Sequence, residues 1–163
     1  MADDPLMLRQ TVLDTTDARG LAEFYRELLG LAYRPGHEPP PPGEDDPDGR
    51  EWLVLRNPGG NQLAFQQVDE LTPSTWPEPG IPQQLHLDLT VTTREALQRE
   101  HARALALGAR VLRDESQDEI EPIYVYADPA GHPFCIFVAP PPAAADEVPV
   151  SLRVRVRVRS VLP

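Results

Sequence analysis

Apolar and polar residues alternate along several short stretches of the chain, and this period-2 pattern predicts β-strands with one face on a core. The clearest stretch is QLHLDLTV, residues 84–91, in which Leu85, Leu87 and Leu89 alternate with His86 and Asp88. We expect the leucines to pack beneath a helix and the polar side chains to lie on the opposite, concave side. The same reasoning predicts strands at residues 7–15, 50–56, 61–68, 109–114, 121–129 and 132–139.

Two stretches have apolar residues at helical spacing instead. In ARGLAEFYRELLG, residues 18–30, Asp17 is the expected N-cap and Gly30 the expected stop. In REALQREHARALALG, residues 94–108, Gly108 takes the same place at the end. Each helix therefore follows directly on a predicted strand.

The order of these elements forms an internal repeat of the type β-α-β-β-β, with module 1 at residues 8–68 and module 2 at residues 84–138. A proline-rich connector, residues 69–83, joins the modules, and the proline- and acid-rich segment 35–49 is predicted to be an exposed loop. We expect an α+β fold in which the modules form a curved mixed sheet with a central cup and helices outside. This domain spans residues 1–139.

Residues 140–163 follow the domain as a Pro/Ala-rich break and a tail that alternates valine and arginine. Two interpretations remain open for the tail: a disordered extension, or an added edge strand with its valines inward.

Charge and composition narrow the classes of function. The chain has 163 residues and a net charge of -11, which argues against nucleic acid as a partner because phosphate binding needs a basic surface. Without a long apolar run or a basic leader, we expect a cytoplasmic protein with no membrane contact. Cys135 is the single cysteine and excludes an internal disulfide.

Three stretches, VLDTTDARGLAEFYRELLGL, HLDLTV and DPAGHPFCIF, resemble the vicinal oxygen chelate superfamily of glyoxalases, bleomycin-resistance proteins and dioxygenases, most closely its glyoxalase-like subgroup. The resemblance implies that a metal-using member would place ligands at Gln10, Ala64, His86 and Cys135. Because Ala64 offers no donor atom, we predict no metal and no cofactor. A divalent metal that recruits Asp88 or Glu51 remains an alternative.

The concave face supplies the candidate binding residues. His86 can donate or accept a hydrogen bond near neutral pH, although pairing with Asp88 purely for its own satisfaction is an equally good interpretation. Aromatic rings on strands suit an organic ligand, and ordinary packing is the alternative for each ring. No basic neighbour activates Cys135, so no catalytic residue is assigned. The predicted ligand-binding residues are Gln10, Trp52, Gln66, His86, Asp88, Tyr124 and Cys135.

Three functions compete on these grounds. The first is a metal-independent protein that binds a small organic molecule in its cup, as drug-sequestering resistance proteins do. The second is a metal-dependent lyase, isomerase or dioxygenase of the glyoxalase type, and the third is a non-catalytic scaffold. Whether the chain is an enzyme stays open, as does a homodimer in which two chains exchange modules to form the cup.

Overall fold

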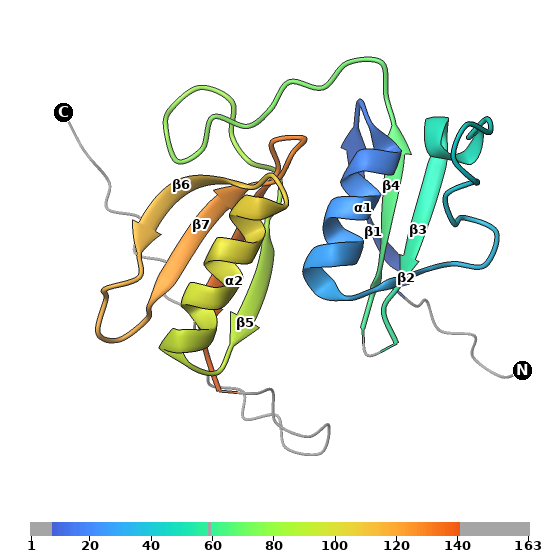
Figure 1. Cartoon of the computed structure of the whole chain (residues 1–163). Helices are drawn as coiled ribbons and strands as arrows, with labels where there is room; N and C mark the ends of the chain where they lie inside the picture. Colours follow the sequence, from blue (N-terminus) through green and yellow to red (C-terminus); the bar gives the residue numbers. More distant parts are fainter. Residues whose placement is uncertain (1–7, 59, 141–163) are drawn as a thin grey trace, which may run out of the picture.

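The computed structural model describes residues 8–58 and 60–140, and it contains two modules of one helix and four strands each (Figure 1). The tail interpretations lie outside the described residues. Module 1 contains β1 (Gln10–Thr15), α1 (Ala18–Leu29), β2 (Ala32–Tyr33), a 3₁₀ turn η1 (Asp48–Arg50), β3 (Trp52–Arg56) and β4 (Gln62–Gln67). Module 2 contains β5 (Leu87–Val91), α2 (Arg94–Ala106), β6 (Arg110–Glu115), β7 (Ile123–Ala127) and β8 (Pro133–Val138). The predicted α+β repeat is confirmed.

The two sheets have the same strand order and the same register. Module 1 has the order β1-β4-β3-β2 and module 2 the order β5-β8-β7-β6, with β1 parallel to β4 and β5 parallel to β8. Val12 pairs with Ala64 in module 1, as Asp88 pairs with Cys135 in module 2. Among the described strands no pairing crosses between modules, so the sheets are two separate hydrogen-bonded units.

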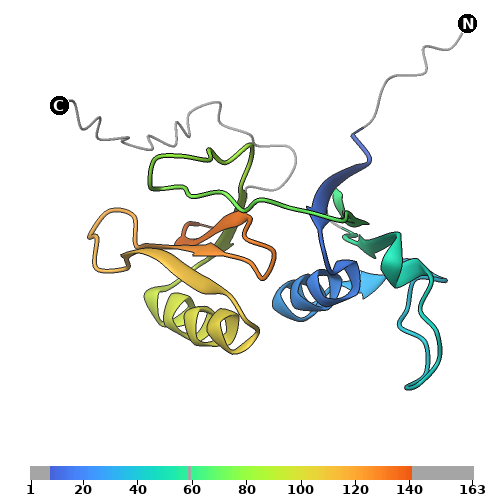
Figure 2. The same ribbon diagram turned by 90° about the horizontal axis from the view of Figure 1, so that it is seen from above.

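Both helices lie on the same side of the molecule (Figure 2). Their starts follow the predicted capping chemistry: the Asp17 side chain accepts from the Gly20 N–H at 2.8 Å, and Thr93 Oγ1 accepts from the Ala96 N–H at 3.1 Å. Gly30 ends α1 in the left-handed region, with φ of 65°, as predicted for a C-terminal stop. The face of each sheet that is turned away from its helix is called its open face below.

Helix α1 holds the two modules together. Its buried residues pack on the sheet of module 1, while Phe24 and Tyr25 also contact Phe134 of module 2, with ring centroids 5.9 and 6.4 Å apart. The Tyr25 hydroxyl donates to Asp128 Oδ2 at 2.9 Å, and the Asp128 side chain is fully buried. The buried apolar residues of both modules therefore form one continuous core.

The loop between β2 and η1 is mostly exposed, as predicted, but it is attached to α1. Arg19 donates to Asp46 Oδ2 at 2.8 Å and to the carbonyl oxygen of His37 at 2.8 Å.

In the described part of the chain, no helix has both the length and the apolar composition that a membrane crossing requires.

Candidate functional site

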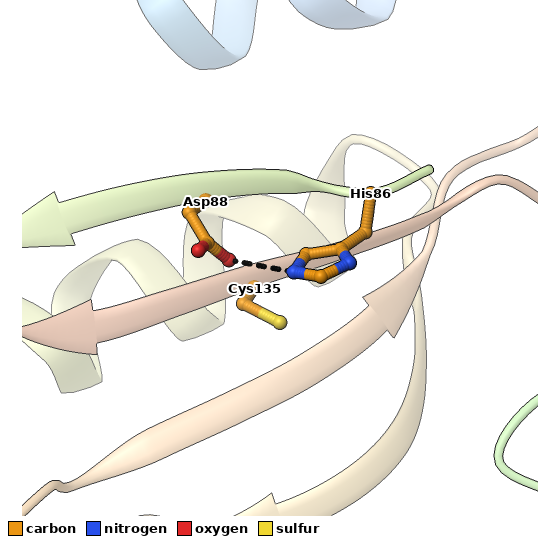
Figure 3. Close-up of side chains that lie close together, drawn as sticks. All are labelled: His86, Asp88 and Cys135. Atoms are coloured by element: carbon orange, nitrogen blue, oxygen red, sulfur yellow. Dashed lines mark ion pairs between the residues drawn. The ribbon is translucent and has the colours of Figure 1, made fainter. Parts of the chain in front are cut away.

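Three of the predicted site residues meet on the open face of module 2. Asp88 on β5 is the register partner of Cys135 on β8, and His86 directly precedes β5 on the same face as Asp88. In Figure 3 the three side chains lie in front of these strands, with α2 behind them. Their potential ligand atoms all lie within 4.8 Å of one another. We call His86, Asp88 and Cys135 the polar trio.

The polar trio is linked through the Asp88 carboxylate. His86 Nε2 lies 3.2 Å from Asp88 Oδ1, and the side chains of these residues are 35% and 45% exposed. Cys135 is buried. Burial, followed by the charge of Asp88 and a hydrogen bond to it, raises the pKa of the Cys135 thiol to about 12. Cys135 is therefore a protonated thiol at neutral pH and no ready nucleophile.

Module 1 has no comparable group at the equivalent positions. The shared register places Gln10, Val12 and Ala64 where module 2 has His86, Asp88 and Cys135. Ala64 is fully buried, and the side-chain oxygen of Gln10 is buried without a hydrogen-bond partner among the described residues. Module 1 thus contributes one amide at these positions, where module 2 has three polar side chains.

Trp52 and Gln66 lie opposite each other on β3 and β4. They share the open face of module 1 with Ala64, since Leu53 and Phe65 point into the core. The hydrogen bonds and ion pairs of the described residues do not join Gln10, Trp52 or Gln66 to the polar trio. The structure therefore brings together three of the seven predicted residues and leaves three on the other sheet.

Tyr124, the seventh predicted residue, lies on the wrong face for a cup residue. Its ring stacks on His101 of α2 with centroids 4.0 Å apart, and its hydroxyl donates to Gln98 Oε1 at 3.3 Å. On β7, Val125 pairs with Cys135 and so occupies the open face. Alternation then directs Tyr124 toward α2, because neighbouring residues of a strand point to opposite faces.

The metal site that the resemblance implies can be tested on donor chemistry. Its four positions offer an amide, a methyl group, an imidazole and a thiol at Gln10, Ala64, His86 and Cys135. A methyl group cannot bind a metal ion, so these residues do not fit the divalent-metal set of the superfamily. Among the described residues, the potential metal-binding group is the polar trio, from module 2 alone, and it does not include Glu51.

Sequence reasoning missed a second polar group, around the turn between β7 and β8. The buried Asp128 carboxylate accepts from the backbone N–H groups of Ala130, Gly131 and His132, and its Oδ2 lies 3.0 Å from His132 Nδ1. In the sequence, DPAGH contributes to the family resemblance, and neither Asp128 nor His132 is among the predicted site residues. The signal that could have revealed this group is the spacing of Asp128 and His132, because a tight turn brings residues four positions apart close together.

The fold and the comparisons agree on the class of protein. The sequence profile of the glyoxalase-like domain family matches residues 10–137, so the chain belongs to that family. This confirms the resemblance to the vicinal oxygen chelate superfamily. Among curated proteins, none matches the sequence.

Solved structures with the same fold have low sequence identity to the chain. A glyoxalase/bleomycin resistance protein/dioxygenase family enzyme from Burkholderia phytofirmans PsJN is 17% identical, with 82% of this chain and 98% of that chain covered and a TM-score of 0.61. A glyoxalase/dioxygenase from Nostoc punctiforme is 19% identical, with 86% and 99% covered and a TM-score of 0.61. A lactoylglutathione lyase from Agrobacterium tumefaciens is 18% identical, with 84% and 96% covered and a TM-score of 0.52. At these identities the likeness concerns the fold alone.

Proposed function

We propose that the chain is a glyoxalase-like protein that binds a small organic molecule on the open face of module 2, with the polar trio as its polar binding group and without the superfamily's metal chelate. One observation carries the proposal. Three polar side chains converge in module 2, whereas the equivalent positions of module 1 offer one amide and two apolar side chains, too few donors for a shared metal ion.

The chemistry of the polar trio favours ligands that donate hydrogen bonds. The Asp88 carboxylate is an acceptor, and the His86 imidazole can either donate or accept. A net charge of -11 adds a weak long-range attraction for cations. A cationic or amphipathic organic molecule is the class that fits best, and Trp52 and Gln66 on the other sheet are candidate contacts for its remote part.

The proposal includes a homodimer. The polar trio lies on a sheet face that no helix of its own module covers, and the side chains of His86 and Asp88 remain about 40% exposed. A second copy lying over the open face of module 2 would exclude water from the ligand, which strengthens hydrogen bonds to it. Sedimentation of the full chain with and without a bound compound measures this assembly.

Variants that copy module 1 into module 2 test the binding site. Chelator-treated protein is first screened against cationic and neutral aromatic compounds by thermal shift, because a ligand that binds only the native state raises the melting temperature. Titration calorimetry then compares His86→Gln and Asp88→Val with wild type. We expect each variant to weaken binding by about ten-fold or more, since each removes a hydrogen bond to a charged or polarised group.

Glu95→Gln, which removes one carboxylate from α2 on the other side of the sheet, is the matched control and should bind as wild type does. Unchanged affinity in both trio variants would reject the site.

A metal-dependent lyase or dioxygenase is the second candidate, and one observation favours it: the polar trio offers three donors within 4.8 Å, the number of protein ligands in a catalytic zinc site. Elemental analysis of protein purified without chelator separates the candidates. Stoichiometric metal that His86→Gln abolishes would overturn the metal-free proposal, whereas metal-free protein that still binds its compound supports it.

A further inference from the structure

A cavity of about 390 Å³ lies where β1, the connector and the turn between β7 and β8 meet, and we call it the junction cavity. Figure 1 shows the connector crossing from module 1 to module 2 close to this turn. The connector packs tightly there, since a Cβ on Gly131 would lie 2.5 Å from Pro73. None of the seven predicted site residues lines the cavity. Its volume falls in the range of small-molecule sites.

Two hydrogen-bond acceptors of the lining lack partners among the described residues. Gln83 Oε1 is buried without a hydrogen bond, which is unusual because buried polar atoms are nearly always paired. His132 Nδ1 faces the buried Asp128 carboxylate at 3.0 Å, so in the neutral ring this nitrogen carries the proton. His132 Nε2 is then left as an acceptor. The carboxylate of Asp14 adds a negative charge to the same lining.

The apolar part of the lining is unusually exposed. Val12, Ile81 and Leu85 are 38%, 40% and 45% exposed, and they make up three of the six large apolar side chains that the described residues expose. Apolar side chains that gather at one place on a surface indicate a binding site more strongly than scattered ones do. The junction cavity therefore combines an apolar wall with acceptor groups and a negative charge.

We propose that the junction cavity binds a small organic cation, a protonated amine attached to an apolar or aromatic body. The ammonium group donates to Gln83 Oε1 and His132 Nε2 and lies in the field of Asp14, and the body packs on Val12, Ile81 and Leu85. This site is separate from the polar trio and goes beyond the proposed function. An anionic ligand of the same shape is disfavoured, because the cavity presents acceptors and a carboxylate.

Tryptamine and indole-3-propionate test the proposal, because they share an indole body and differ in the sign of their charge. Titration calorimetry of the full chain should show tryptamine binding at least about ten-fold more tightly than indole-3-propionate. Gln83→Met and His132→Asn, the latter matching Asn61 of module 1, should each weaken tryptamine by about ten-fold. Gln117→Met, in the turn between β6 and β7, is the control for loss of an amide outside the cavity and should bind tryptamine as wild type does.

Gln83→Met has a second readout that a structural role would not give. It removes a buried acceptor without a partner, so the unliganded melting temperature should stay equal or rise. Equal affinity for both indoles, no measurable binding of either, or a lower melting temperature with unchanged tryptamine affinity would overturn the proposal.

Two further outcomes identify other occupants. If tryptamine affinity is lost in His86→Gln but kept in Gln83→Met, the amine binds at the polar trio, which refutes the junction site and leaves the proposed function intact. If the chain sediments as a dimer that Leu85→Glu dissociates, a second copy covers the cavity and the proposal fails.

Discussion

Modules 1 and 2 share a backbone plan and differ in the chemistry placed on it. In both modules the first strand pairs in parallel with the last, and Leu13 opposite Phe65 corresponds to Leu89 opposite Ile136. On the open faces the same register places Val12 beside Ala64 in module 1 and Asp88 beside Cys135 in module 2. Apolar side chains directed at the helix therefore specify strand pairing in both modules, while positions on the open face are free to differ.

The helices differ in the same way. Tyr25 of α1 and His101 of α2 occupy equivalent positions. The Tyr25 hydroxyl donates a hydrogen bond to Asp128 of the other module. His101 Nδ1, in contrast, lies 3.0 Å from the Tyr126 hydroxyl of its own module. Six residues of α1 are buried and two of α2. Helix α1 is thus packed from both sides, whereas α2 leaves more of its surface exposed.

The largest expected effect concerns Cys135, which has no counterpart in module 1. Its pKa is raised from 9.0 to about 12, so at pH 8 its thiolate fraction is about a thousand-fold lower than that of an unfolded chain. Alkylation by iodoacetamide, followed by mass spectrometry, should be slower in the native protein by well over ten-fold, because the lower thiolate fraction outweighs the higher nucleophilicity of a more basic thiolate. The native rate should rise with pH well beyond pH 9, because ionisation is complete only above the raised pKa.

Asp88→Asn sharpens this prediction. Removing the carboxylate charge lowers the pKa of Cys135 and should speed alkylation relative to the native chain, although burial still slows it relative to the unfolded chain. Native and urea-unfolded protein that react within ten-fold of each other would contradict the protonated, buried thiol.

The next prediction tests the aromatic packing between α1 of module 1 and β8 of module 2. Phe134 is fully buried, and its ring lies 4.9 Å from that of Tyr126 and 5.9 Å from that of Phe24 on α1. Phe134→Ala should lower the free energy of unfolding by about 3–5 kcal/mol, measured by urea denaturation. Because its contacts reach α1, native-state hydrogen exchange should become faster in α1 as well as in β8.

Leu97, a fully buried residue of α2, provides the control, because Leu97→Ala creates a cavity within module 2. It should destabilise the chain by about 2–5 kcal/mol without selectively increasing exchange in α1. Exchange in α1 that Phe134→Ala does not change would show that the modules open independently.

Local patterns in the sequence predicted most of the fold. Alternation of apolar and polar residues predicted the strands, and Asp17 as cap and Gly30 as stop predicted the two ends of α1. Each of these signals acts within a few residues. Strand β2 has only two residues, too few for alternation to detect. The sequence also did not show which face of β7 each side chain occupies, because IYVYA is apolar on both faces. Tyr124 was therefore expected on the open face, but it points toward α2.

The sites were predictable to different degrees. The polar trio follows from sequence because the repeat aligns β5 with β1 and β8 with β4, which brings His86 and Cys135 to one face. Nothing local brings Val12, Gln83 and His132 together, because their meeting depends on how the connector packs across two modules. A cavity of this kind is a tertiary feature without a sequence period.

The smallest effect asks whether the modules are equivalent where their helices begin. Asp17 and Thr93 each accept a hydrogen bond from a backbone N–H of the first turn, so Asp17→Ala and Thr93→Ala should each lower the free energy of unfolding by about 1 kcal/mol. Asp17→Asn and Thr93→Ser keep the accepting oxygen and should recover most of the loss in urea denaturation. If Asp17→Ala costs several times more free energy than Thr93→Ala, loss of the α1 cap destabilises the whole core, because α1 contacts both modules. Equal costs would instead show that the two helices differ only in side chains beyond the first turn.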